Sequence, residues 1–277
     1  MEHRVKSILG YSDAFMAKLK MFSGHTATYT HIIERQRMRL DPPKFAPIDE
    51  AHDHYVKVIY NTQLQKLSAL GNGLIRAIEG DEFLAYGLMG RSLLEHISVW
   101  RYFLVNEYSK VIASTGMDDF EKGLALIEVH KRFLFGTKFD WSTWLGGEGA
   151  AGTLESAYLD RLKKKVGKHK PPIQSVQVGE CVRAIGSQLP KYGVYYDLFC
   201  DFVHPNIGSN FLGYSISSDG VLELVKDGDI MLGRKLIEET FSHLADLTFG
   251  QVSELTKSHF SMLWGEPPPH IIETRVG

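Results

Sequence analysis

The sequence predicts a mainly all-α protein, a helical bundle with one β-hairpin inserted near residues 211–225. Apolar residues recur at steps of three and four along several long stretches, which is the pattern of helices with one face in a core. Alternating patterns flank Ser217-Ser218-Asp219-Gly220, and an Asp-Gly turn between such runs is typical of a β-hairpin. The composition, 44% hydrophobic and 23% charged, is that of an ordinary globular protein.

The first 45 residues are expected to form a helical arm. Two helical pieces are predicted, with a break near Ser23-Gly24. Prolines at positions 42, 43 and 47 then favour an extended connector, because proline disfavours the helical conformation of the residue before it. Such an arm is suited to pack on another protein or on a second subunit.

Residues 46–264 are expected to form a single helical-bundle domain, followed by a proline-rich tail at 265–277. A helix from about Asp49 to Ala77 precedes Gly80, and a central helix covers 81–108, with Asp81 as its expected N-cap. The glycine between them predicts an antiparallel hairpin. Further helices are expected at about 117–134, 154–166, 174–189, 192–204 and 230–262.

The region between 139 and 170 contains two patterns that resemble phosphate-binding features. Gly146, Gly147 and Gly149 lack the ending of a phosphate-binding loop, so a surface loop is the expected structure. A basic run follows at Lys163, Lys164, Lys165 and Lys168. It is either a solvated helix end or a patch that contacts phosphates.

Net charge and cysteine content narrow the possible environments. A formal net charge of −2 gives no field that would attract nucleic acid to the whole protein, so polyanion binding requires a local patch. Cys181 and Cys200 lie in apolar helical patterns and are expected to be free thiols. Neither a signal peptide nor a membrane span is predicted. We therefore expect a cytoplasmic location.

Polar residues form a stripe on the central helix, which is otherwise apolar on nearly every face. Arg91, Glu95, Ser98 and Tyr102 follow one another at steps of four, three and four, so they stack along one side. Charges on a buried helix must be paired or must line a cavity, because isolated burial costs too much free energy. This stripe is the first candidate for a functional site.

A second polar line is expected on the helix at 192–204. Asp197, Asp201 and His204 recur at steps of four and three. If the two lines face each other, Arg91 can pair with Asp201, and Glu95 with His204. The alternative is an intrahelical Arg91–Glu95 ion pair within a buried network that only sets the register of the helices.

These residue types suit several chemistries. A metal-independent ribonuclease needs a histidine to move a proton and an arginine to hold charge on phosphorus, so Arg91 could act with His96 or His204. Ser98, Tyr102, Asp197 and Asn206 are the candidate substrate contacts beside the lysine run. Asp201-x-x-His204 has the spacing of half a di-iron site, and residues 49–54 hold a second acidic and histidine cluster. Neither a metal nor another cofactor is expected, and the apolar surroundings of Cys200 argue against a nucleophilic role.

Two segments carry a resemblance to a known superfamily. Arg91-Ser-Leu-Leu-Glu95 in an apolar helix, followed about a hundred residues later by Phe202-Val203-His204-Pro205, resembles an uncharacterised bacterial helical family distantly related to the HEPN superfamily. The resemblance would cover residues 50–260. It implies a helical bundle that dimerises and, in many members, a metal-independent RNase of toxin–antitoxin or phage-defence systems with an Arg-x4–6-His motif.

Arg91 and His96 have the spacing of that motif, although on an early rather than a late helix. The motif is therefore either split across two helices, with His204 as the histidine, or the protein is an inactive relative.

Two functional hypotheses follow. In the first, the protein is an endoribonuclease in which Arg91 stabilises the phosphorane and His204 or His96 moves the proton. Glu95 and Asp201 orient these groups, and the lysine run gathers RNA. In the second, the protein is a non-catalytic helical module that binds a protein partner or a nucleotide, and the polar network is architectural.

Overall fold

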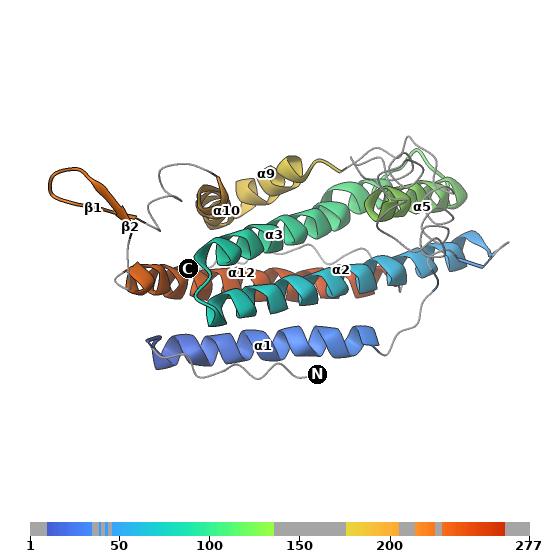
Figure 1. The fold of residues 1–277 in the computed structure, drawn as a ribbon. Helices are drawn as coiled ribbons and strands as arrows, with labels where there is room; N and C mark the ends of the chain where they lie inside the picture. The colour runs from blue at the N-terminus through green and yellow to red at the C-terminus, as the bar shows by residue number, and fades with distance from the viewer. Residues whose placement is uncertain are drawn as a thin grey trace, which may run out of the picture.

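Four long helices carry most of the core: α1 (Asp13–Glu34), α2 (Ile48–Glu79), α3 (Phe83–Tyr102) and α12 (Asp229–Leu263). The computed structural model describes residues 10–34, 39, 42–43, 46–135, 176–204, 214–224 and 229–263. In Figure 1, α1 forms the lowest layer, α2 and α12 lie above it, and α3 lies above these two. The prediction of a mainly all-α fold is confirmed.

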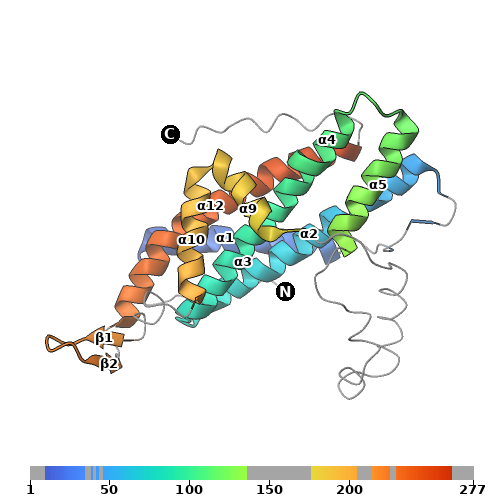
Figure 2. The same cartoon turned by 90° about the horizontal axis from the view of Figure 1, so that it is seen from above.

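Shorter elements complete the described chain. A π-helical turn, η1 (Phe103–Tyr108), and α4 (Ser109–Ile112) continue α3, and α5 (Asp119–Phe135) folds back beside them. Figure 2 shows this corner from above. Helices α9 (Val178–Gln188) and α10 (Pro190–Val203) pack on α3. The central helical rod therefore runs from Phe83 to Ile112, four residues beyond the predicted end.

Helix α1 belongs to the bundle rather than to a separate arm. Phe15, Leu19 and Phe22 are buried in the same hydrophobic core as α2 and α12. Lys18 fastens the polar side of α1 to α12 through Asp246 at 2.7 Å. The expected break at Ser23-Gly24 is absent, because the apolar face continues through these residues and holds the helix in one piece.

The α2–α3 hairpin contains a residue with a left-handed backbone. Asp81 has a φ of 52°, and its carboxylate binds the Arg234 guanidinium of α12, with Nε at 2.8 Å from Oδ1. Asp81 was expected to be the N-cap of the central helix. Instead Glu82 precedes the first residue of α3, and Asp81 ties the hairpin to α12.

Glycines allow α10 to approach α3 closely. A Cβ built on Gly87 would lie 2.6 Å from Phe202, and one built on Gly90 would lie 2.6 Å from Phe199. The two phenylalanines therefore fill the space left by the missing side chains. This packing sets the rotation of α10, and with it the face that α10 presents to Arg91.

A short antiparallel pair precedes α12. Strands β1 (Tyr214–Ile216) and β2 (Leu222–Leu224) pair with Tyr214 opposite Leu224, and Ser217 to Gly220 form the turn. The remaining expectations for the lysine run, Asn206, the glycine-rich segment, the helix at 154–166 and the tail lie outside the described residues. No described helix is long and apolar enough to cross a bilayer.

Candidate functional site

The stripe on α3 meets α10 at a partly exposed polar cluster. The Nε–H of Arg91 donates to Glu95 Oε1 at 2.9 Å, and the two side chains are 30% and 26% exposed. The Tyr196 hydroxyl donates to the same oxygen at 3.1 Å. The carbon at the centre of the Arg91 guanidinium lies 5.9 Å from the centre of the Tyr196 ring. The Glu95 Oε1 atom thus accepts hydrogen bonds from residues of two helices, α3 and α10.

Electrostatics within this cluster favour a charged guanidinium. The hydrogen bond to Glu95 raises the pKa of Arg91, and Cys200 and Tyr196 also contribute. Burial raises the pKa of Tyr196 to about 12, with further contributions from Cys200 and Glu95. Arg91 therefore stays positively charged and Tyr196 stays a donor at neutral pH.

The face of α10 that meets Arg91 differs from the predicted one. Tyr196 and Cys200, four residues apart, lie toward Arg91, whereas Asp197 and Asp201 are exposed. The packing of Phe199 and Phe202 on the glycines of α3 turns both aspartates outward. The expected Arg91–Asp201 and Glu95–His204 pairs are replaced by an Arg91–Glu95–Tyr196 chain.

His204 ends α10 one turn beyond Cys200. Its backbone N–H donates to the Cys200 carbonyl at 3.0 Å, and its side chain is exposed. Each four-residue step advances about 40° around a helix, so His204 lies about 80° from Tyr196 and about 20° from Asp197, toward the exposed side of α10. Because Phe202 packs on Gly87 and Phe199 on Gly90, His204 lies beyond the level of Arg91, toward the start of α3.

His96 does not share the Arg91 site. Its Nε2–H donates to the Gln63 carbonyl of α2 at 2.9 Å, and its side chain is buried. Burial lowers the pKa of His96 to about 4. Five residues along a helix turn a side chain by about 140°, so Arg91 and His96 face different helices. The literal Arg-x4-His motif therefore makes no joint site.

Two other residues of the predicted stripe do not join the Arg91 cluster. Ser98 is fully buried, and its Oγ lies within hydrogen-bond distance of the Leu94 carbonyl, at 2.9 Å, and of the Tyr192 hydroxyl, at 3.0 Å. It is therefore a packing residue and not a substrate contact. Tyr102 lies near Glu107 and Cys181, and burial is the largest cause of its raised pKa. It belongs to a different cluster, at the far end of α3.

That far end contains charges that the sequence reasoning did not single out. Arg132 of α5 pairs with Glu107 of the π-helical turn at 3.2 Å. Arg101 is 8% exposed and donates to the amide oxygens of Gln251 at 3.1 Å and Gln188 at 2.5 Å. Arg101 could have been noticed in the sequence, because it is a charged residue on a helix that is otherwise apolar on nearly every face. Each side chain ties α3 or η1 to a neighbouring helix.

Two histidines lie where α2 meets α12 and η1. The Trp100 Nε1–H donates to His259 Nδ1 at 3.2 Å, and His259 Nε2–H donates to the Val56 carbonyl at 2.8 Å. His52 Nε2 lies 3.0 Å from the Tyr108 hydroxyl, and its Nδ1 lies 3.3 Å from Asp53. No group of three or more His, Cys, Asp or Glu side chains in the described chain could hold a metal ion.

Comparison with models of known protein families, with characterised proteins and with solved structures found no significant match. The α3–α10 cluster is the candidate site. This cluster holds a fixed, partly exposed arginine, and an exposed histidine ends the neighbouring helix. Both cysteines are free thiols, with Cys181 buried and Cys200 partly buried.

Proposed function

We propose that the protein is a metal-independent endoribonuclease of the HEPN-like type, with Arg91 and His204 as its catalytic residues. One observation carries the proposal. Arg91 binds Glu95 through Nε, and within the described part of the chain neither of its Nη groups has a hydrogen-bond partner. A half-exposed guanidinium held by its Nε offers both Nη groups to a phosphate.

The chain would supply a proton acceptor and a charge stabiliser. The 2′-oxygen of the substrate attacks the adjacent phosphorus while the His204 imidazole takes the hydroxyl proton. The new O2′–P bond forms, the P–O5′ bond breaks, and the 5′-oxygen leaves with a proton from solvent. The Arg91 guanidinium offsets the charge that develops on the phosphoryl oxygens. The products are a 2′,3′-cyclic phosphate and a 5′-hydroxyl.

Glu95 and Tyr196 act as positioning residues in this proposal. Glu95 fixes the plane of the guanidinium, and Tyr196 holds Glu95 from the opposite helix. Asp197 and Asp201 line the exposed side of α10 and would repel phosphates, so Arg91 supplies the attraction that holds the scissile phosphate. The lysines at 163–165 and 168, with Asn206, are proposed to gather RNA. Dimerisation and a toxin or phage-defence role follow from the resemblance and belong to the same proposal.

Cleavage of RNA in excess chelator tests the proposal. We expect wild-type protein to cleave single-stranded RNA and to leave the matching all-deoxy oligonucleotide intact. The Arg91→Ala and His204→Ala variants should each lose at least about a hundredfold in rate, since general acid–base catalysis contributes that much. Arg183→Ala and His31→Ala, at exposed positions on α9 and α1, are the matched controls. Products with 3′-phosphates formed only after metal addition would contradict the proposal.

A second candidate is the non-catalytic helical module. It is favoured by the buried hydrogen bonds among Ser98, Tyr192 and the Leu94 carbonyl, which serve only to join α3 and α10. In that case Arg91→Ala lowers thermal stability, and purified wild-type protein cleaves no RNA. The same cleavage assay, read beside the melting temperature of each variant, separates the two candidates.

A further inference from the structure

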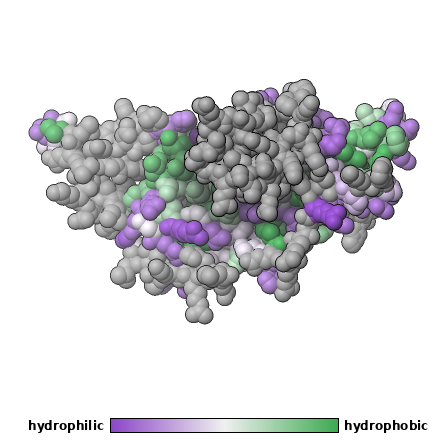
Figure 3. Space-filling view, turned by 45° about the vertical axis from the view of Figure 1, so that its right-hand side comes forward, coloured by the Kyte–Doolittle hydropathy of each residue, from purple (hydrophilic) through white to green (hydrophobic). Residues whose placement is uncertain are grey.

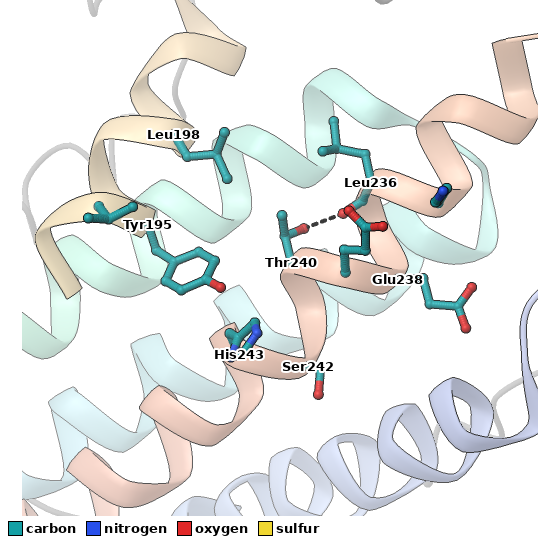
Figure 4. Close-up of a pocket in the computed structure, with 10 residues that line it drawn as sticks. Tyr195, Leu198, Leu236, Glu238, Thr240, Ser242 and His243 are labelled. Atoms are coloured by element: carbon teal, nitrogen blue, oxygen red, sulfur yellow. Dashed lines mark hydrogen bonds between the residues drawn. The ribbon is translucent and has the colours of Figure 1, made fainter. Parts of the chain in front are cut away.

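A groove lies between α10 and α12, away from the Arg91 cluster. Its volume is about 840 Å³. Leu198 of α10 and Leu236 of α12 contribute apolar surface, and the Tyr195 ring lies beside His243 (Figure 4). Val194, 66% exposed, adds an apolar edge. The groove therefore combines apolar walls with open polar groups.

The polar groups on α12 form a regular line. Lys235, Glu239 and His243 follow one another at four-residue steps, and all three are exposed. None of them has a hydrogen bond or ion pair within the described chain, although Lys235 and Glu239 are close enough in sequence to pair. The charges of Lys235 and Glu239 are thus available to a ligand.

The adjacent line on α12 serves the fold and gives a contrast. Glu238 accepts from Ser12, the residue before α1, and Ser242 accepts from Lys18 of α1. In Figure 4 the Glu238 and Ser242 side chains extend toward α1. Glu238 and Ser242 also border the groove, but hydrogen bonds to Ser12 and Lys18 occupy them. Lys235, Glu239 and His243 have no such bond within the described chain.

An aromatic pair marks one end of the line. The Tyr195 and His243 rings have centres 5.3 Å apart and planes inclined by 31°. This pair offers a flat surface to an aromatic or apolar side chain. Along the groove the order is a positive group, a negative group and an aromatic surface.

We propose that this groove binds one amphipathic helix of a partner protein. Residues four apart on a helix are separated by about 6 Å, which is also the spacing of Lys235, Glu239 and His243. The bound helix would place an acidic residue at Lys235, a basic residue at Glu239 and an aromatic residue at the Tyr195–His243 pair. The basic residue therefore lies between the other two in either direction of the helix. Glu238 and Glu239 make the groove a poor surface for nucleic acid.

The test uses a display library of single-helix peptides with three randomised positions at four-residue steps. Selection on wild-type protein should enrich the order acidic, basic, aromatic, or its reverse. Selection on the Lys235→Glu/Glu239→Lys variant should enrich basic, acidic, aromatic. Each selected peptide should bind its own protein at least tenfold more tightly than the charge-exchanged one. Circular dichroism of the variant, altered only at exposed positions, verifies its fold.

Controls identify other occupants. Val194→Glu, which adds charge at the apolar edge, should weaken the selected wild-type peptide at least tenfold. Enrichment of no peptide, or of peptides indifferent to the charge exchange, overturns the proposal. So does a wild-type dimer that dissociates in the charge-exchanged variant in light scattering, because a second copy would then occupy the groove.

Discussion

The Tyr196 hydroxyl of α10 donates to the Glu95 carboxylate of α3 at 3.1 Å, and that carboxylate also accepts from Arg91. This contact couples the orientation of the proposed catalytic arginine to the position of α10. Figure 3 shows one face of the molecule, on which described residues form hydrophobic areas beside hydrophilic ones. The contact matters because it fixes one oxygen on which two donors converge.

Removal of the Tyr196 hydroxyl should loosen this coupling. Tyr196→Phe is expected to lower the free energy of unfolding by about 0.5–1.5 kcal/mol, the usual contribution of one such hydrogen bond. If Tyr196 positions Arg91, the kcat for RNA cleavage falls in Tyr196→Phe while KM changes little. Tyr195→Phe is the matched control, because its hydroxyl has no hydrogen bond within the described chain. Urea titrations followed by tryptophan fluorescence give the stabilities, and equal losses in both variants would refute the coupling.

The hairpin residue Asp81 gives a test of backbone strain. Its φ of 52° costs a non-glycine residue about 1–2 kcal/mol, which the bidentate contact with Arg234 offsets. Asp81→Ala should therefore be more destabilising than Asp81→Gly by about 1 kcal/mol, since glycine adopts this backbone without strain. A double-mutant cycle with Arg234→Ala in urea isolates the ion pair. A stability of Asp81→Ala equal to that of Asp81→Gly would show that the left-handed backbone is relaxed.

Gly90 and Gly24 have different surroundings, so their replacement by alanine should change the stability in opposite directions. Gly90→Ala should destabilise by about 1–3 kcal/mol, because the new methyl group overlaps the Phe199 ring. Gly24→Ala, in open space on α1, should stabilise by about 0.5–1 kcal/mol through helix propensity. Thermal and urea unfolding of both variants check the signs. A neutral Gly90→Ala would mean that α10 can move away from α3 without cost.

Acid should destabilise the protein through its buried histidines. Burial lowers the pKa of His96 and His259 to about 4 and that of His130 to about 3. The unfolded chain, with ordinary histidine pKa values near 6.5, therefore binds more protons below that pH. Stability is full above pH 6.5 and falls as the pH drops toward 4. His130→Phe should reduce the slope of unfolding free energy between pH 6.5 and 4.5, and an unchanged slope would contradict the assignment to His130.

Much of the fold was accessible from apolar periodicity. The predicted helices at 49–77, 117–134 and 230–262 correspond to α2, α5 and α12 within a few residues. The continuity of α1 was not accessible, because Ser23-Gly24 favours a break locally and only packing on α2 and α12 holds the helix straight. The π-helical turn was also missed. The amino-acid composition does not change at this turn, so the sequence gives no sign of it. In the structure, it determines where Glu107 and Tyr108 lie.

The candidate site was predicted in part. The Arg91–Glu95 ion pair follows directly from four-residue spacing and is present. The rotation of α10 could not be predicted from the sequence, because apolar residues occur on several of its faces. The apolar pattern therefore does not decide whether the Asp197–Asp201 line or the Tyr196–Cys200 line faces α3. Gly87 and Gly90 held the missing information, since only they admit Phe202 and Phe199 so closely. His96 satisfied a spacing pattern, but spacing along one helix does not make two side chains face the same way.

The most direct test of the account is the single-turnover cleavage rate of a 5′-labelled RNA in excess chelator, compared among wild type, His204→Ala and His31→Ala. The account predicts a 2′,3′-cyclic phosphate product from wild type and His31→Ala, with at least about a hundredfold lower rate for His204→Ala. Equal rates in all three proteins, or no cleavage by folded wild type, would contradict it.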